Sequence, residues 1–210
     1  MHKYDVLAKF CIGQIHRSRG KKIIDPTPLV EQFMIFTALL VKFYAYSQRH
    51  MNAVSYANEK NIDFSENSFA DPLNGTRIAA KQRQFFALIR ASPMIKLDGL
   101  EGPNAEDLES SKLVFSRAHW KVIGELYGIL KACQAYTTAA QNETKLNSGL
   151  SYLKLLDLKD FLFGEDLDVV DMNKVDGSKK LIYKKVNTED LHPITQEALN
   201  QTRKTLVVRC

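Results

Sequence analysis

The sequence has few of the residues that interrupt helices or cross-link small folds. Its 210 residues include 10 glycines, 6 prolines and 3 cysteines. So few glycines and prolines argue against a loop-rich or all-β chain. The cysteines, Cys11, Cys133 and Cys210, are far apart and odd in number, so they match neither a disulfide framework nor a zinc-binding set. We therefore expect the protein in a reducing compartment, the cytoplasm.

The sequence also lacks an apolar run long enough to span a bilayer. The most apolar stretch runs from Phe33 to Val41, and Lys42 follows it directly. Even when it is extended to Tyr46, it is shorter than the roughly 18 to 20 apolar residues that a span requires. Near the N-terminus, Lys9 and the polar residues after it interrupt the apolar residues of any secretory signal. The sequence predicts no membrane span.

Enzyme and metal motifs are missing as well. The sequence has no CxxC pair and no HExxH, GxSxG or GxGxxG motif. A calcium loop starting at Asp171 would place Val175 and Ile182 where side-chain oxygens are needed. His119 lies on an apolar helix face, where a single histidine is typically a core residue. We therefore assign no catalytic residue, metal ligand or cofactor, although an enzyme of unfamiliar type remains a third alternative because active sites assemble from distant residues.

What is present is helical periodicity. Apolar residues make up 45% of the chain and charged residues 25%, as in an ordinary globular protein. Apolar residues recur at helical spacing in six segments: about 4–16, 28–59, 77–91, 105–141 (with a break near Ser116), 151–163 and 193–207. We expect Ser92-Pro93 to end the third of these helices.

The segment 28–59 is the most apolar of the predicted helices. At 100° per residue, its solvent-facing positions form one narrow stripe, made of Glu31, Ala38, Lys42, Ala45 and Arg49. A helix with so thin a polar stripe must be surrounded by neighbours. We expect it to be the central helix of a bundle.

After Gly164 the pattern changes from helix to strand. Val169–Val175 and Leu181–Val186 alternate as strands around an Asp176-Gly177 turn, which is typical of a β-hairpin. The predicted fold is therefore mainly α, a bundle of five to seven helices with one C-terminal β-hairpin. We expect a single domain over 1–210, with a helical body at about 1–164, the hairpin at about 168–186 and a last helix at about 193–207.

The charge is unevenly distributed. The chain carries a net charge of +5, but the segment 157–176 holds seven acidic and two basic residues, so the remainder is strongly basic. Basic clusters that converge on one face attract polyanions. Nucleic-acid binding is therefore an alternative function, and its candidate residues are Arg17, Arg19, Lys21, Lys22, Arg77, Lys81 and Arg83.

The leading functional hypothesis comes from the predicted helix at 116–140. Apart from its core face, this helix carries an arc of small residues bordered by aromatic ones. Small residues allow another helix to approach closely, and aromatic rings at the edge supply contact area. The proposed partner-binding residues are Trp120, Gly124, Tyr127, Gly128 and Ala135. The chain would then be a non-catalytic interaction module, an adaptor, chaperone-like subunit or effector that docks a partner helix or strand. The alternative is that another segment of the same chain fills this groove.

Overall fold

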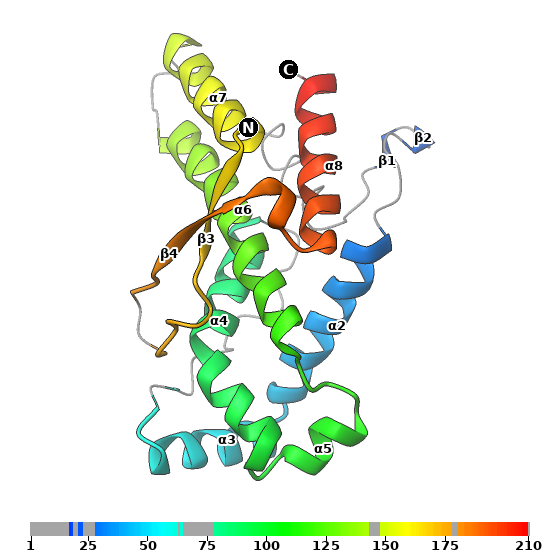
Figure 1. Cartoon of the computed structure of the whole chain (residues 1–210), viewed down its shortest axis with the longest axis vertical. Helices are drawn as coiled ribbons and strands as arrows, with labels where there is room; N and C mark the ends of the chain where they lie inside the picture. The colour runs from blue at the N-terminus through cyan, green and yellow to red at the C-terminus, as the bar shows by residue number, and fades with distance from the viewer. Residues whose placement is uncertain are drawn as a thin grey trace.

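The computed structural model describes residues 17–18, 21–22, 28–62, 64, 78–142, 148–177 and 180–209. Within them the chain is mostly helical, with an antiparallel hairpin near the C-terminus (Figure 1). The expected fold class, a helical bundle with a late β-hairpin, is confirmed. The helix expected over 4–16 lies outside the described residues. The helices are α2 (Pro28–Tyr44), α3 (Ser47–Glu59), α4 (Ile78–Glu101), α5 (Ala105–Ser110), α6 (Arg117–Asn142), α7 (Ser148–Phe163) and α8 (Pro193–Arg209). The strands are β1 (Arg17–Ser18), β2 (Lys21–Lys22), β3 (Asp166–Val170) and β4 (Tyr183–Asn187).

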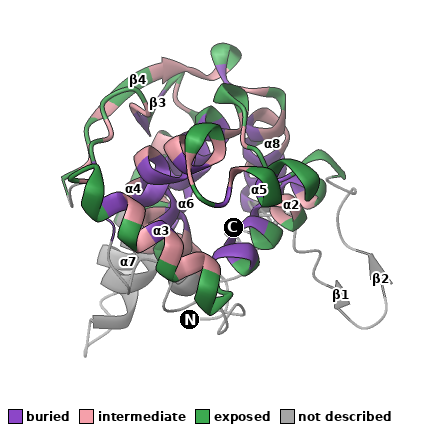
Figure 2. Ribbon diagram, turned by 90° about the horizontal axis from the view of Figure 1, so that it is seen from below, coloured by how far each residue is buried: buried purple, intermediate pink, exposed green. Residues whose placement is uncertain are grey.

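The central element is α6. Every residue from Val122 to Leu130 is buried, so this part of the helix is covered on all sides. Helices α4, α7 and α8 and strand β3 pack against it, and it runs through the middle of the molecule (Figure 1). In Figure 2, where buried residues are purple, α6 lies between α4 and α8 and beneath the hairpin.

The prediction of one central helix over 28–59 is wrong in two respects. The helix ends at Tyr44, and α3 leaves at an angle of 81°. In addition, α2 lies at the side of the bundle, because its outer face is open: Ile35 is 62% exposed, and Leu29 and Leu39 are exposed as well. Apolar composition indicates that a helix can be buried, but a folded surface always retains many apolar atoms.

No single helix in the described part of the chain has both the length and the apolar character that a bilayer crossing demands. Together α2 and α3 meet that test of length and composition, but only across their 81° bend.

A buried carboxylate joins the elements around this bend. Asp98 on α4 accepts a hydrogen bond from the Tyr44 hydroxyl at 2.6 Å. The Asn104 amide group donates to the same carboxylate at 3.0 Å and to the Arg49 backbone carbonyl at 3.1 Å. Burial, and then the charge of Asp98, raise the pKa of Tyr44 well above its usual range, so the phenol keeps its proton. The network links α2, α3, α4 and the start of α5.

Helix α4 does not end at Ser92-Pro93, as the sequence led us to expect. It continues through Pro93 to Glu101. Proline removes one helical hydrogen bond and costs about 3 kcal/mol in a helix interior. The apolar face continues across the proline, with Ile89, Met94 and Ile95 all buried. Burial of such side chains contributes roughly 1.5–3 kcal/mol each, which is enough to offset that loss.

The expected break near Ser116 is confirmed, since α5 ends at Ser110 and α6 begins at Arg117. Ser116 and His119 cap the start of α6 reciprocally. The Ser116 backbone N–H donates to Nδ1 of His119 at 3.1 Å, and the His119 N–H donates to the Ser116 hydroxyl at 3.3 Å. This exchange satisfies two of the backbone groups that a helix start leaves unpaired, as a capping box does.

The hairpin exists, but with different strands and a longer connection than the sequence predicts. Strand β3 ends at Val170, where the predicted strand continued to Val175. The chain turns away from the strand direction at Asp171. The carboxylate of Asp171 accepts a hydrogen bond from the Asn173 N–H at 3.3 Å, and its backbone carbonyl accepts one from the Lys174 N–H at 2.9 Å. Gly177 has a positive φ of 91°, as suits glycine in a turn, but it lies in this longer connection, where Arg90 of α4 donates to its carbonyl.

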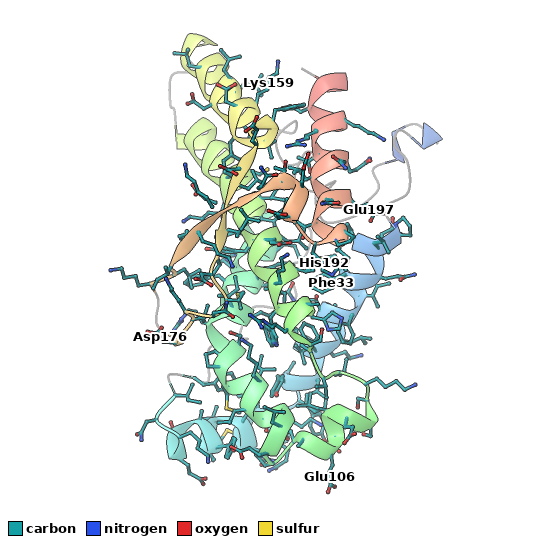
Figure 3. All side chains as sticks on the ribbon, viewed as in Figure 1. Phe33, Glu106, Lys159, Asp176, His192 and Glu197 are labelled. Atoms are coloured by element: carbon teal, nitrogen blue, oxygen red, sulfur yellow. The ribbon has the colours of Figure 1, made fainter. Side chains whose placement is uncertain are left out.

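The C-terminal helix α8 is confirmed within a few residues of its expected bounds. It packs against α2, α6 and α7. Its Glu197 accepts a hydrogen bond at 2.9 Å from the backbone N–H of Val30, in the first turn of α2. Glu197 is labelled in Figure 3. Arg203 donates to the Leu162 carbonyl at the end of α7 at 2.6 Å. These contacts hold three helices together by their ends.

Candidate functional site

The small-residue face of α6, where the sequence predicts partner binding, is covered by the hairpin. A Cβ atom at Gly124 would lie 2.9 Å from the Val170 carbonyl oxygen and 2.9 Å from Cγ of Met172. One at Gly128 would overlap the Asp168 carbonyl oxygen. The sequence left open whether this groove is free or filled by the same chain. In the structure, the groove is filled by β3 and the two residues that follow it.

The hairpin register explains why carbonyl groups face the helix. Asp171 donates to the Ile182 carbonyl, and Thr188 donates to the Glu165 carbonyl, so these positions form the hydrogen-bonded pairs. Pairs alternate along an antiparallel ladder, so the backbone groups of Asp168 and Val170 point away from β4. They point at α6, where glycine is the residue that allows a strand edge to approach so closely.

The two aromatic residues of the predicted partner-binding set are buried in the fold. Trp120 and Tyr127 are buried, at 2% and 4% exposure. Burial raises the pKa of Tyr127 to about 12, and its hydroxyl accepts a hydrogen bond from the Gln82 side chain at 3.1 Å. The side chain of Ala135 lies outside the described residues. Among the described members of this set, the two glycines and Tyr127 offer no open surface for a partner helix, whereas Trp120 lines the cavity described next.

A cavity of about 660 Å³ opens beside this covered face, and we call it the α4–α6 cavity. Its walls come from the C-terminal half of α4, from α5 and the segment after it, from the first turns of α6, and from the hairpin with its connection. Its lining is mainly apolar. The apolar lining residues are Ile95, Gly99, Leu100, Leu108, Leu113, Val114, Phe115, Ala118, Trp120, Val169, Val170 and Met172.

The mouth of this cavity carries apolar side chains in contact with solvent. Leu100 is 79% exposed, the most exposed of the large apolar residues described, and Val114 is also exposed. Single exposed apolar residues are normal, but here they border a concave apolar site. The combination distinguishes this surface from the outer face of α2.

Trp120 forms part of the cavity lining. Its ring contacts Phe115, with ring centroids 5.2 Å apart, and the Lys96 ammonium lies 5.5 Å from its ring centroid. The indole Nε1 is buried and has no acceptor within the described residues. Trp120 is also the single tryptophan of the chain, so its emission can report on this cavity.

The charged residues of the lining are basic apart from one acid. Lys96, Arg117, Lys121 and Lys184 line the cavity, with Glu125 as the single acidic residue among the described lining residues. Glu125 is occupied by the fold: its carboxylate accepts from the Thr195 hydroxyl at 2.6 Å and from the His192 backbone N–H at 3.1 Å. It therefore holds the start of α8, near the His192 label in Figure 3.

Two residues that commonly carry chemistry have structural surroundings here. His119 packs against Phe36 and Phe115, with ring centroids 5.0 and 5.4 Å away. Its burial, and then the nearby His192, lower its pKa. Cys133 is buried, and burial raises the pKa of its thiol to about 12, so it is not a thiolate nucleophile at neutral pH. Across the described ranges, no three His, Cys, Asp or Glu side chains group as a metal site would.

The basic residues proposed for nucleic acid fall into two groups. Strands β1 and β2 pair Arg17 with Lys22, so these two residues face each other across a short ladder. On α4, Lys81 is half-buried and Arg83 is exposed. Arg19 and Arg77 lie outside the described residues, as do the side chains of Arg17, Lys21 and Lys22.

The sequence reading missed the α4–α6 cavity for a specific reason. The sequence predicted that the helix ends at Ser92-Pro93, whereas α4 continues to Glu101 and carries Gly99 and Leu100 to the cavity. The available signal was an apolar Leu100 between charged and small residues, followed by Leu113 and Val114 after α5. Only the bend between α5 and α6 brings these residues together.

In comparisons with known proteins, no family model matches the chain, and no significant similarity is found to a curated sequence or to a solved structure.

Proposed function

We propose that this chain is a non-catalytic interaction module, such as an adaptor, chaperone-like subunit or effector, and that it docks a partner helix or strand at the α4–α6 cavity. The observation that supports this most is the apolar cavity of about 660 Å³ with the exposed Leu100 at its mouth. Pockets that bury a drug-sized ligand have volumes of about 300–1,000 Å³, so this one can take a few apolar side chains of a partner.

The walls of the cavity fit this mode of recognition. A groove between two helices receives an amphipathic segment that inserts apolar side chains at regular spacing. The inserted side chains would contact apolar residues of the lining, such as Ile95 and Leu113. Apolar anchors of this kind, enclosed in pockets, account for most of the affinity in many protein interfaces.

Selection from a phage-displayed library of random peptides tests the proposal, using the full chain as bait. The matched control is Gly99→Leu. A Cβ at Gly99 meets Leu108 at an ordinary 3.8 Å, so the variant should fold while its longer side chain enters the cavity. We expect peptides with apolar anchors that bind the wild-type chain and not Gly99→Leu. If no peptide distinguishes the two proteins, while melting curves show both folded, the proposed docking site is wrong.

A second candidate function is the binding of single-stranded nucleic acid. One observation favours it, the pairing of Arg17 with Lys22 across β1 and β2, which brings cationic residues together. Phosphate contacts make affinity fall steeply as salt rises. Titration with a labelled oligonucleotide should then show binding at low salt that weakens in Arg17→Gln. Absence of binding at low salt eliminates this function.

A further inference from the structure

The charges around the α4–α6 cavity indicate what a partner must carry. The four cationic side chains and the one carboxylate of its lining give a net charge of +3. Two of the cations are already engaged. Lys121 lies 3.6 Å from Oε1 of Glu125 and donates to the Asp190 carbonyl at 2.9 Å, and Lys184 lies 3.8 Å from Asp171.

The other two cations, Lys96 and Arg117, have no carboxylate partner within the part of the chain that the structure describes. Lys96 is half-buried, and the contact recorded for its ammonium is with the Trp120 ring. A cation that is partly removed from water without a counter-ion is unfavourable, and a neighbouring cation adds to this. An anion supplied by a partner would therefore stabilise these two cations.

The direction of the Lys96 pKa shift agrees with this geometry. Burial, and then the charge of Arg117, lower the pKa of Lys96. An anion bound between these two side chains would favour the charged lysine and raise that pKa again. Lys81, on the same helix, is also half-buried with a lowered pKa, but it donates to Gln84 and does not line the cavity.

We infer that the partner segment is acidic as well as apolar: an apolar side chain enters the α4–α6 cavity, and an Asp or Glu beside it binds between Lys96 and Arg117. This inference rests on the proposed docking function and adds the chemistry of the partner. A protein segment fits better than a small amphiphile because the apolar surface continues outward over Leu100 and Val114, beyond the enclosed volume.

The peptide selection described above, repeated on Lys96→Met and on Arg117→Gln, tests the inference. With the wild-type chain as bait, we expect selected peptides to carry Asp or Glu within a few residues of the apolar anchor. Either substitution should remove that acidic preference while the apolar anchor persists. The control bait Lys81→Met, which loses a half-buried cation elsewhere on α4, should select the same acidic peptides as the wild type.

Affinities give the quantitative form of the test. Binding of a selected acidic peptide should weaken about fivefold in Lys96→Met and in Arg117→Gln, because a partly exposed ion pair contributes on the order of 1 kcal/mol or less. Added salt should weaken the binding of this peptide to the wild type. It should have little effect on binding to a variant that carries both Lys96→Met and Arg117→Gln. Replacing the peptide's acidic residues with Gln or Asn should match the loss caused by the protein substitutions.

The possible failures are distinguishable. Peptides that require the open cavity but show no acidic preference would overturn this inference and leave the docking function standing. No peptide sensitive to Gly99→Leu would overturn both. Dodecanoate, an apolar carboxylate, serves as the competing small ligand. If it binds the wild type and not Gly99→Leu while no peptide does, the occupant is a small amphiphile and the protein-partner assignment is wrong.

Discussion

The Asp168 carbonyl group lies directly against Gly128, with no room for a Cβ atom between strand and helix. The same arrangement recurs one helical turn earlier, between Val170 and Gly124. A strand edge normally presents unpaired backbone groups, which proteins cover to prevent unwanted pairing. In this fold the two glycines of α6 cover one edge of the hairpin. The feature that the sequence offered as a docking groove is therefore part of how the chain closes its own core.

This contact predicts that Gly128→Ala destabilises the fold. Alanine favours the helix by about 1 kcal/mol relative to glycine, but the strand must move to accommodate it, and overpacking costs roughly 1–3 kcal/mol. We expect a net loss in the free energy of unfolding, measured by urea denaturation. Gly99→Ala is the matched control: it has space at its Cβ and should be neutral or stabilising by up to about 1 kcal/mol. Equal effects at both positions would contradict the close approach.

The position of α2 at the side of the bundle predicts different effects at two adjacent leucines. Leu40 is fully buried, whereas Leu39 points outward and is 48% exposed. Leu40→Ala should destabilise by about 2–5 kcal/mol through lost burial and a residual cavity. Leu39→Ala should change stability by about 0.5 kcal/mol or less. Thermal melts of the two variants measure the two losses of stability. Similar losses in both variants would contradict the position of α2 at the side of the bundle.

The buried Asp98 network predicts a strong effect of removing one hydroxyl group. Tyr44→Phe takes away the donor 2.6 Å from Asp98 and leaves a carboxylate oxygen without that partner. Losses of this kind are about 1–3 kcal/mol, or more when the group is charged. Tyr56→Phe removes an exposed hydroxyl that donates to Glu101 at 3.3 Å, and it should have little effect. Chemical denaturation of both variants makes the comparison, and an unchanged Tyr44→Phe variant would show that the network is not stabilising.

The lowered pKa of His119 predicts that the folded protein loses stability as the pH falls. Its pKa in the folded chain is lowered by burial and then by His192, so the unfolded chain takes up the proton first as the pH falls. Stability should therefore decrease as the pH falls below about 6.5, the usual histidine pKa. His119→Asn keeps an acceptor for the Ser116 N–H, which His119 supplies through Nδ1, and does not titrate. We expect this variant to lose less stability between neutral and mildly acidic pH. An imidazole NMR titration giving a pKa above 6.5 would contradict the assignment.

Short-range sequence signals predicted this fold well at positions where neighbouring residues alone determine the backbone conformation. The start of α6 after Ser116 and the positive φ of Gly177 follow from short-range chemistry, capping in one case and glycine's freedom in the other. The extent of α4 did not follow, because Pro93 is a helix breaker by propensity and only tertiary burial of Met94 and Ile95 carries the helix past it.

The α4–α6 cavity could not be predicted from the helical periodicity of the sequence, because it depends on which helices pack against each other. Glycine at 124 and 128 indicates a close approach in any fold, but it does not state whether a helix or a strand approaches, or from which chain. Lys96 and Arg117 lie 21 positions apart in the sequence. They share a cavity only because α5 and the bend after it turn α6 back along α4. Neither residue belonged to any basic cluster visible along the chain.

The most direct test of the docking proposal uses the emission of Trp120, the single tryptophan, which lines the α4–α6 cavity. A peptide selected on the wild-type chain is titrated into the wild-type protein and into Gly99→Leu while tryptophan emission is followed. The peptide should itself contain no tryptophan. We expect a change in Trp120 emission that saturates with binding in the wild type, and neither binding nor an emission change in Gly99→Leu. Binding of equal strength to both proteins, with Trp120 emission unaltered, would contradict the assignment of this cavity as the docking site.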